Sequence, residues 1–171
     1  MEIKTIDGFV PYWERIRKRT VRVASQIPED QIEWSPGPGR YSFGDMLRHL
    51  GAIERYMFAE NAHLRPSRYP GHEAKFAVGF DNVMSYLATL HGESVGLFGL
   101  LSPEDLQKRC TTPGGASIPV WKWLRAMVEH EVHHRGQIYH MLTTIGVETP
   151  PLYGLTAEEV FAASDPYEPG R

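Results

Sequence analysis

Apolar side chains recur at steps of three and four residues in four long segments of the chain. This spacing places them on one face of an α-helix, so each segment is predicted to be an amphipathic helix. The predicted helices span about Asp7–Gln26, Ser42–Leu64, Glu73–Leu100 and Val120–Ile145. A short last helix begins at about Thr156, and the Gly-, Thr- and Pro-rich segment Thr111–Pro119 is a predicted loop or small hairpin.

Four helices of similar length predict an all-α fold, an up-down-up-down four-helix bundle with a short extra C-terminal helix. In that topology the second and fourth helices run parallel to each other. The 171 residues are enough for one domain with a sizeable core. We therefore expect a single domain over residues 1–171, with a loose tail from about residue 165.

Composition narrows the classes of function. The formal net charge of −3 argues against a general nucleic-acid-binding surface, and no apolar run is long enough to cross a membrane. The N-terminal residues lack the pattern of a signal peptide. The single cysteine, Cys110, excludes an internal disulfide and fits a reducing cytoplasm.

The segment from His130 to Gln137 reads His-Glu-Val-His-His-Arg-Gly-Gln. His130 and His134 are one helical turn apart and project from the middle of the apolar stripe, while His133 lies on its flank. Two buried imidazoles without partners cost free energy, and one shared metal ion satisfies both. The alternative is a histidine pair that is hydrogen-bonded to core carboxylates.

A third metal ligand is expected from another helix at the same depth. If the second and fourth helices run parallel, His49 lies within about 5 Å of the level of His130. His91, near the end of the third helix, also lies at a plausible depth. The spacing alone leaves both histidines open as the third ligand.

Several other polar side chains lie near this predicted site. Gln137 shares the stripe of the histidine pair, where it could hydrogen-bond a substrate or make a helix–helix contact. Glu131 leaves the stripe, which favours a surface or interhelical ion pair over a contact with a ligand histidine. Asp45 and Tyr56 share a face with His49, but a helix cap is favoured for Asp45 and a core position for Tyr56.

The run His-Glu-Val-His-His-Arg-Gly-Gln-Ile-Tyr-His-Met-Leu, preceded by an isolated histidine in Ser-Phe-Gly-Asp-Met-Leu-Arg-His-Leu, resembles the DinB/YfiT-like superfamily. The resemblance implies a four-helix bundle, commonly a homodimer, with zinc or nickel held by one histidine of the second helix and two of the fourth. Here these are His49, His130 and His134, so the resemblance favours His49 over His91. It also implies chemistry on low-molecular-weight thiols such as mycothiol and bacillithiol.

Three neutral imidazoles leave a coordination position open, which is typical of a catalytic metal site. We therefore expect a divalent-metal-dependent transferase or hydrolase acting on a small molecule, and the resemblance implies a low-molecular-weight thiol as a further cofactor. No general base or other catalytic residue follows from the sequence, and Gln137 is the candidate for the substrate pocket. Imidazole ligands suit several metals, so zinc and nickel rest on the resemblance.

A carboxylate-bridged di-iron bundle is a second hypothesis, because it needs two Glu-x-x-His motifs and two further glutamates. The chain has such motifs at residues 60–63 and 131–134, with Glu14 and Glu93 on the other helices. However, the two motifs differ in depth by roughly 10 Å along the bundle, which disfavours this site.

The third hypothesis is a non-catalytic, metal-stabilised dimeric interaction module. The fourth helix has a second apolar stripe on its back, formed by Trp121, Val128, Val132 and Tyr139. A bundle helix is usually polar there, so we expect the C-terminal segment or a second subunit to cover this face.

Overall fold

The computed structural model describes residues 2–165, and nearly all of its regular structure is helical, as predicted. The helices are α1 (Ile6–Ala24), α2 (Phe43–Ile53), α3 (Ala59–Ala62), α4 (Phe80–Phe98), α5 (Pro103–Gln107), α6 (Val120–Thr144) and α7 (Ala157–Ala163). A π-helical turn (Glu54–Phe58) joins α2 to α3, and 3₁₀ turns lie at Glu29–Gln31 and Ala74–Phe76. Strands β1 (Arg109–Thr111) and β2 (Ser117–Pro119) form an antiparallel hairpin that begins two residues before the segment predicted as a loop or hairpin.

Local sequence signals fix where the helices begin and end. At the start of α2, the backbone N–H of Asp45 donates to Ser42 Oγ at 2.9 Å, and the backbone N–H of Ser42 donates to Asp45 Oδ2 at 3.1 Å. This reciprocal cap confirms the predicted capping role of Asp45. At the other end of the chain, α6 stops just before Gly146, which takes the positive φ of 76° that ends many helices.

The third long helix was predicted to begin at Glu73, but α4 begins at Phe80. Residues Ala74–Phe76 form a separate 3₁₀ turn, and Gly79 has a φ of 82° and a ψ of 159°. A backbone in that region cannot continue an α-helix, so Gly79 separates the apolar positions before it from the helix that follows. The connection between α3 and α4 is therefore longer than predicted.

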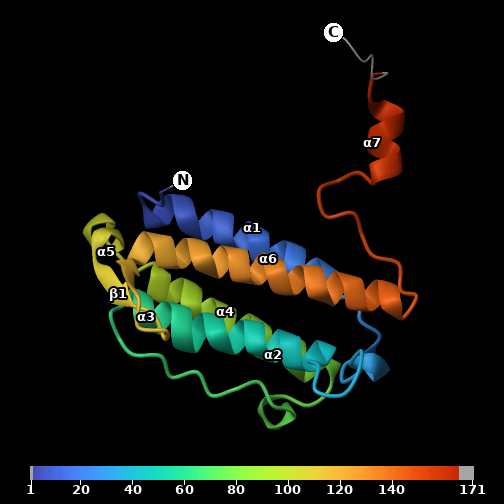
Figure 1. The fold of residues 1–171 in the computed structure, drawn as a ribbon, viewed down its shortest axis with the longest axis horizontal. Coiled ribbons are helices and arrows are strands. Elements are labelled where there is room, and N and C mark those ends of the chain that lie inside the picture. Colours follow the sequence, from blue (N-terminus) through green and yellow to red (C-terminus); the bar gives the residue numbers. More distant parts are fainter. Residues whose placement is uncertain (1, 166–171) are drawn as a thin grey trace.

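The direction of α4 contradicts the predicted up-down-up-down order. His91 Nδ1 of α4 lies 3.0 Å from Glu54 Oε1, and Arg55 Nε donates to Glu93 Oε2 at 2.9 Å. Residue numbers on the two segments thus increase together, so α4 runs parallel to α2. The reason is the connection over residues 63–79, which returns along the length of α2 before α4 starts (Figure 1). A long crossover of this kind places consecutive helices parallel.

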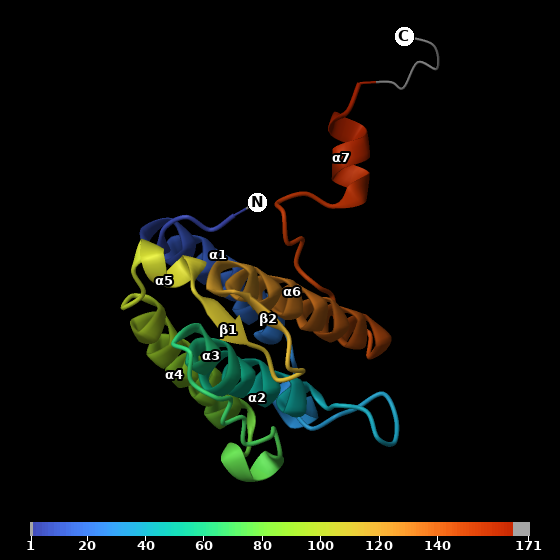
Figure 2. The same ribbon diagram turned by 60° about the vertical axis from the view of Figure 1, so that its left-hand side comes forward.

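The remaining long helices run in the opposite direction to α2 and α4. His49 and Phe58 of the α2–α3 segment contact His130 and Trp123 of α6 respectively, so the numbers rise on one segment as they fall on the other. The premise that the second and fourth long helices run parallel is therefore wrong. α1 lies beside α6 in both views of the ribbon. The long helical segments α1, α2–α3, α4 and α6 lie side by side, with their axes roughly along one direction (Figures 1 and 2).

The interior has two apolar clusters that are separated by a polar layer. One cluster surrounds Trp13 and Leu124, and the other surrounds Phe43 and Leu87, all of them fully buried. Buried polar side chains occupy the layer between the clusters: Arg17, Thr20, His49, Glu54, Ser94, Glu131 and Arg135. Because buried polar groups need partners, this layer is where functional chemistry is expected.

The C-terminal part of the described chain leaves the body of the molecule. The predicted short extra helix is present as α7, which stands away from the other helices (Figures 1 and 2). Its Phe161 is 84% exposed. Apart from Asp165, the predicted loose tail lies outside the described residues. Among residues 2–165, we find no helix with the length and hydropathy of a membrane span.

Candidate metal centre

Three histidines from two helices converge in the polar layer. His49 comes from α2, and His130 and His134 come from successive turns of α6. The Nε2 atom of His130 lies 3.1 Å from the Nε2 atoms of both His49 and His134. Two Zn–N bonds of about 2.05 Å at a tetrahedral angle hold their nitrogens about 3.3 Å apart, so this spacing fits a shared ion. The structure therefore brings together the three histidines that the sequence pointed to.

Hydrogen bonds on the far side of two rings leave the Nε2 lone pairs free. His134 Nδ1 lies 2.7 Å from Gln137 Oε1, an oxygen that can only accept, so the Nδ1–H donates. His49 Nδ1 lies 2.8 Å from Tyr69 Oη, which in turn lies 3.0 Å from His72 Nδ1. Donation from His49 to Tyr69 and from Tyr69 to His72 satisfies all three groups. Ligand histidines in metal sites commonly hold their other ring nitrogen in this way.

The three imidazoles are neutral in the folded protein at neutral pH. Burial, together with the neighbouring imidazoles, lowers the pKa of His49 to about 3 and that of His130 to about 4. Burial also lowers the pKa of His134, against the opposing effect of its hydrogen bond to Gln137. A neutral imidazole offers a lone pair, so the protonation state of the cluster fits metal binding as well.

Beneath the histidines, Glu54 holds a network of buried polar groups. Its carboxylate accepts hydrogen bonds from Trp13 Nε1 at 2.7 Å and from Arg17, and it lies 3.0 Å from His91 Nδ1. His91 is thus bound to Glu54 and is not the third member of the cluster. Arg17 also lies 3.3 Å from Glu131, which confirms the interhelical ion pair predicted for Glu131, although that pair is buried.

Glu54 was not among the predicted site residues; it follows the apolar stripe of the second helix and opens the π-helical turn. Four residues later, Phe58 also faces the core, with its ring centroid 5.8 Å from that of His130. π-Helical turns occur frequently at functional sites, where they change the face that a helix presents. A carboxylate directly after a run of apolar positions was the signal available in the sequence.

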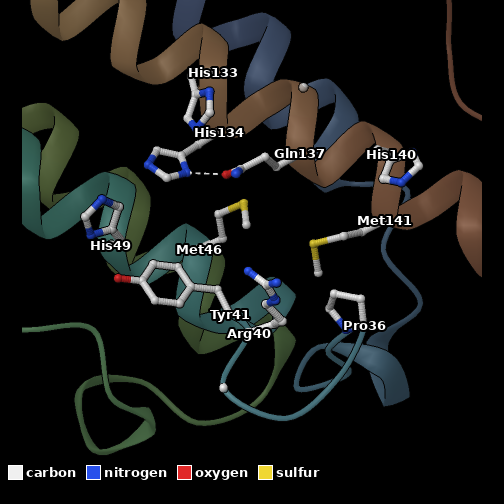
Figure 3. Close-up of a pocket in the computed structure, with 12 residues that line it drawn as sticks. Pro36, Arg40, Tyr41, Met46, His49, His133, His134, Gln137, His140 and Met141 are labelled. Carbon is white, nitrogen blue, oxygen red and sulfur yellow. Dashed lines mark hydrogen bonds between the residues drawn. The ribbon is translucent and has the colours of Figure 1, made fainter.

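A cavity of about 730 Å³ opens beside the histidines. Figure 3 shows His49 and His134 at one end, with the Gln137 side chain next to them. Its walls come from the loop before α2 (Pro36, Arg40, Tyr41), from α2 (Met46, His49) and from α6 (His133, His134, Gln137, His140, Met141). The predicted pocket residue Gln137 lies in this wall. The contribution of Arg40 and Tyr41 was missed, because loop residues carry no periodic signal.

The other candidate residues lie elsewhere. Asp45 is bound to Arg48 at 2.8 Å, and neither Asp45 nor the half-buried Tyr56 lines the cavity. Cys110 is buried, and burial raises the pKa of its thiol, which does not suit a reactive cysteine.

The carboxylates of the di-iron hypothesis do not converge. Glu60 is paired with Arg55 and Arg65, Glu93 with Arg55, and Glu14 is exposed. In the described part of the chain, the three histidines are the one group of metal-binding side chains close enough to share an ion.

Comparison with known proteins gives one family match and similar solved structures. Residues 12–138 match the sequence model of the DinB superfamily. A DinB-like protein from Bacillus cereus is similar in structure, with a TM-score of 0.72, 18% identity, and coverage of 86% of this chain and 97% of that one. A DinB-like protein from Bacillus subtilis gives a TM-score of 0.69, 19% identity, and coverage of 87% and 99%. At these identities the likeness concerns the fold, and no curated protein matches the chain. The family match covers most of the chain and includes all three histidines, so the chain belongs to the DinB superfamily.

Proposed function

We propose that the chain is a divalent-metal-dependent enzyme whose ion is held by His49, His130 and His134. The observation that carries this proposal is the convergence of three Nε2 atoms, with His130 Nε2 at 3.1 Å from each of the other two. We also propose that α1, the α2–α3 segment, α4 and α6 form a four-helix bundle around this site, of the kind that the resemblance implies. The metal would be zinc or nickel, both of which suit imidazole ligands.

The surroundings of the histidines favour a catalytic site over a structural one. Structural zinc sites are closed by four protein ligands, whereas catalytic sites keep a position open. Within residues 2–165, no fourth histidine, cysteine or carboxylate joins the cluster, and two of its members line the cavity. A divalent ion there would supply Lewis acidity, which makes a water or a thiol easier to deprotonate.

The cavity wall supports transfer or hydrolysis on a small molecule. Its volume of about 730 Å³ suits a small ligand. The wall contains no serine, threonine, cysteine, lysine or carboxylate side chain that could act as the nucleophile. The nucleophile would then be water or a thiol carried by a small molecule. Gln137 and Tyr69 would hold the rings of His134 and His49 in position during the reaction.

Elemental analysis of the protein purified without added metal tests the site. The wild-type chain should carry close to one divalent ion, while His49→Ala and His134→Ala should lose it. His133→Ala is the matched control, because His133 is an exposed neighbour on the same helix and should leave the metal content unchanged. Full retention of metal in both ligand variants would overturn the proposal.

Turnover separates an enzyme from an interaction module. The metal-loaded protein should consume a low-molecular-weight thiol in the presence of an electrophile, or hydrolyse the thiol adduct, and chelation should stop the reaction. A protein that holds its metal and forms dimers, but turns over none of a broad panel of thiols and electrophiles, would instead be the metal-stabilised module.

We propose further that the chain forms a homodimer through its exposed apolar side chains. On the back of α6, Val132 remains 40% exposed, and Tyr12 of α1 is 36% exposed. The C-terminal segment approaches Tyr139 but does not cover Val132. Light scattering after size exclusion should give twice the mass of the chain, and Val132→Glu should give the monomer. A monomeric wild-type protein at micromolar concentration would contradict the dimer.

A further inference from the structure

The lining of the cavity beside the histidines carries charge of one sign. Its charged side chain is Arg40, and it contains no aspartate, glutamate or lysine. The chain as a whole has a formal net charge of −3, so the cavity differs in sign from the rest of the molecule. A divalent ion on the histidines would add two further positive charges. A cavity of this kind favours a negatively charged ligand.

No carboxylate in the described part of the chain pairs with the guanidinium of Arg40. The two carboxylates nearest to it in the sequence, Glu33 and Asp45, are both bound to the buried Arg48, at 2.7 and 2.8 Å. In the described part of the chain, Arg40 makes no ion pair. Figure 3 shows its side chain directed into the cavity. A guanidinium without a partner in a cavity wall is suited to bind a carboxylate or phosphate.

Between the histidines and Arg40, the cavity wall offers a ligand hydrogen-bond donors, and these come from Gln137. Gln137 Oε1 already accepts from His134, so the groups that Gln137 presents to a ligand are its two amide N–H bonds. Met46 and Met141 provide apolar surface on the same cavity. This arrangement matches a ligand with acceptor oxygens at one end, a metal-binding group at the other and an apolar skeleton between them.

We propose that this cavity binds a small molecule that carries an anionic oxygen group, a carboxylate or a phosphate, and that Arg40 binds this group. The proposal rests on the proposed function, because the metal on His49, His130 and His134 holds the other end of the ligand. Arg40 is thus a specificity-determining residue: it selects anionic over neutral molecules that have the same metal-binding group.

Binding to the cobalt-loaded protein tests the proposal without reference to turnover. Thiolate coordination to cobalt gives a near-ultraviolet charge-transfer absorption, which reports binding of the thiol end. The probes are 3-mercaptopropanoate, its neutral isostere 3-mercaptopropanamide, and 2-mercaptoethyl phosphate. The carboxylate, the phosphate or both should bind roughly tenfold more tightly than the amide, as expected for one charge-assisted hydrogen-bonded pair. Whichever of the two anions binds more tightly shows whether the preferred ligand carries a carboxylate or a phosphate.

Substitutions at Arg40 separate this preference from metal binding. Arg40→Gln should retain cobalt and bind the amide as the wild type does, but lose the preference for the anion, and Arg40→Glu should reverse it. Arg15→Gln removes the same charge from an exposed position on α1 and should leave the preference intact. Equal binding of acid, phosphate and amide by a metal-loaded wild type would overturn this inference alone. Failure to load metal would overturn the proposed function instead.

Discussion

Metal binding at the three histidines should release few protons, even in mildly acidic solution. Ligand imidazoles must be neutral to bind, so ordinary histidines release protons as the ion enters. In this structure burial has already lowered the pKa of His49 to about 3 and that of His130 to about 4, and it lowers that of His134 as well. Most of the deprotonation therefore accompanies folding and does not accompany metal binding.

The size of the effect follows from the pKa values at pH 6. An imidazole with the ordinary pKa of 6.5 is about three-quarters protonated there, so three of them would release about 2.3 protons. His49 and His130 together retain about 0.01 proton at pH 6 when their pKa values are about 3 and 4. His134 contributes less than about 0.8 proton, and a metal-activated water with a pKa near 7 adds about 0.1. The expected release is below one proton per ion.

Isothermal titration of zinc into the metal-free protein, in several buffers of different ionisation enthalpy, measures this number directly. The slope of the observed enthalpy against the buffer enthalpy gives the protons released. An unfolded peptide of residues 126–141 is the control, because its histidines are solvated and should release close to the ordinary amount per ligand. Release of two or more protons by the folded protein would refute the argument that burial keeps these imidazoles neutral.

Three further predictions follow from the same contacts. Tyr69→Phe removes the hydroxyl next to His49 Nδ1 and should weaken zinc binding by roughly tenfold or more in a chelator competition; an unchanged affinity would exclude a role for this hydrogen bond. Glu54→Gln should lower the free energy of unfolding in urea by about 3–5 kcal/mol because it leaves Arg17 without its closest buried partner. The same change at the half-exposed Glu93 should cost less than about 1 kcal/mol, and equal losses would contradict the difference in burial. Because the histidine pKa values are lowered on folding, the unfolded chain binds more protons below pH 6.5; the urea midpoint of the metal-free protein should therefore fall as the pH drops from 6.5 towards 4.

The periodic pattern predicted the long helices well, because burial of one helix face is recorded directly in the sequence. It failed where a single backbone conformation decides the outcome. The apolar positions continue across residues 73–100, yet the positive φ of Gly79 ends any helix there. The periodic pattern also could not predict the direction of a helix in the bundle, because an amphipathic stripe has the same spacing in either direction.

The histidine cluster illustrates which sequence arguments were reliable. His130 and His134 lie one turn apart on one helix, and that relation does not depend on the arrangement of the other helices. The depth argument for His49 assumed parallel helices, whereas α2 and α6 are antiparallel. His49 nevertheless belongs to the cluster. The sequence motif around His49 therefore predicted the third histidine more reliably than the estimate of its depth along the helix axis.

The crossover over residues 63–79 accounts for both the wrong topology and the missed partners of the site. A chain that returns along α2 must pass the outer side of His49, and it places Tyr69 within 2.8 Å of His49 Nδ1. Arg48, one residue earlier on α2, fixes this path, because its guanidinium donates to the backbone oxygens of His72 at 2.8 Å and Ala77 at 2.9 Å. The same buried arginine that binds the crossover to the helix thus determines which side chain contacts His49. Replacing the crossover by a short turn would restore the predicted helix order, but it would also remove the hydrogen bond that orients His49.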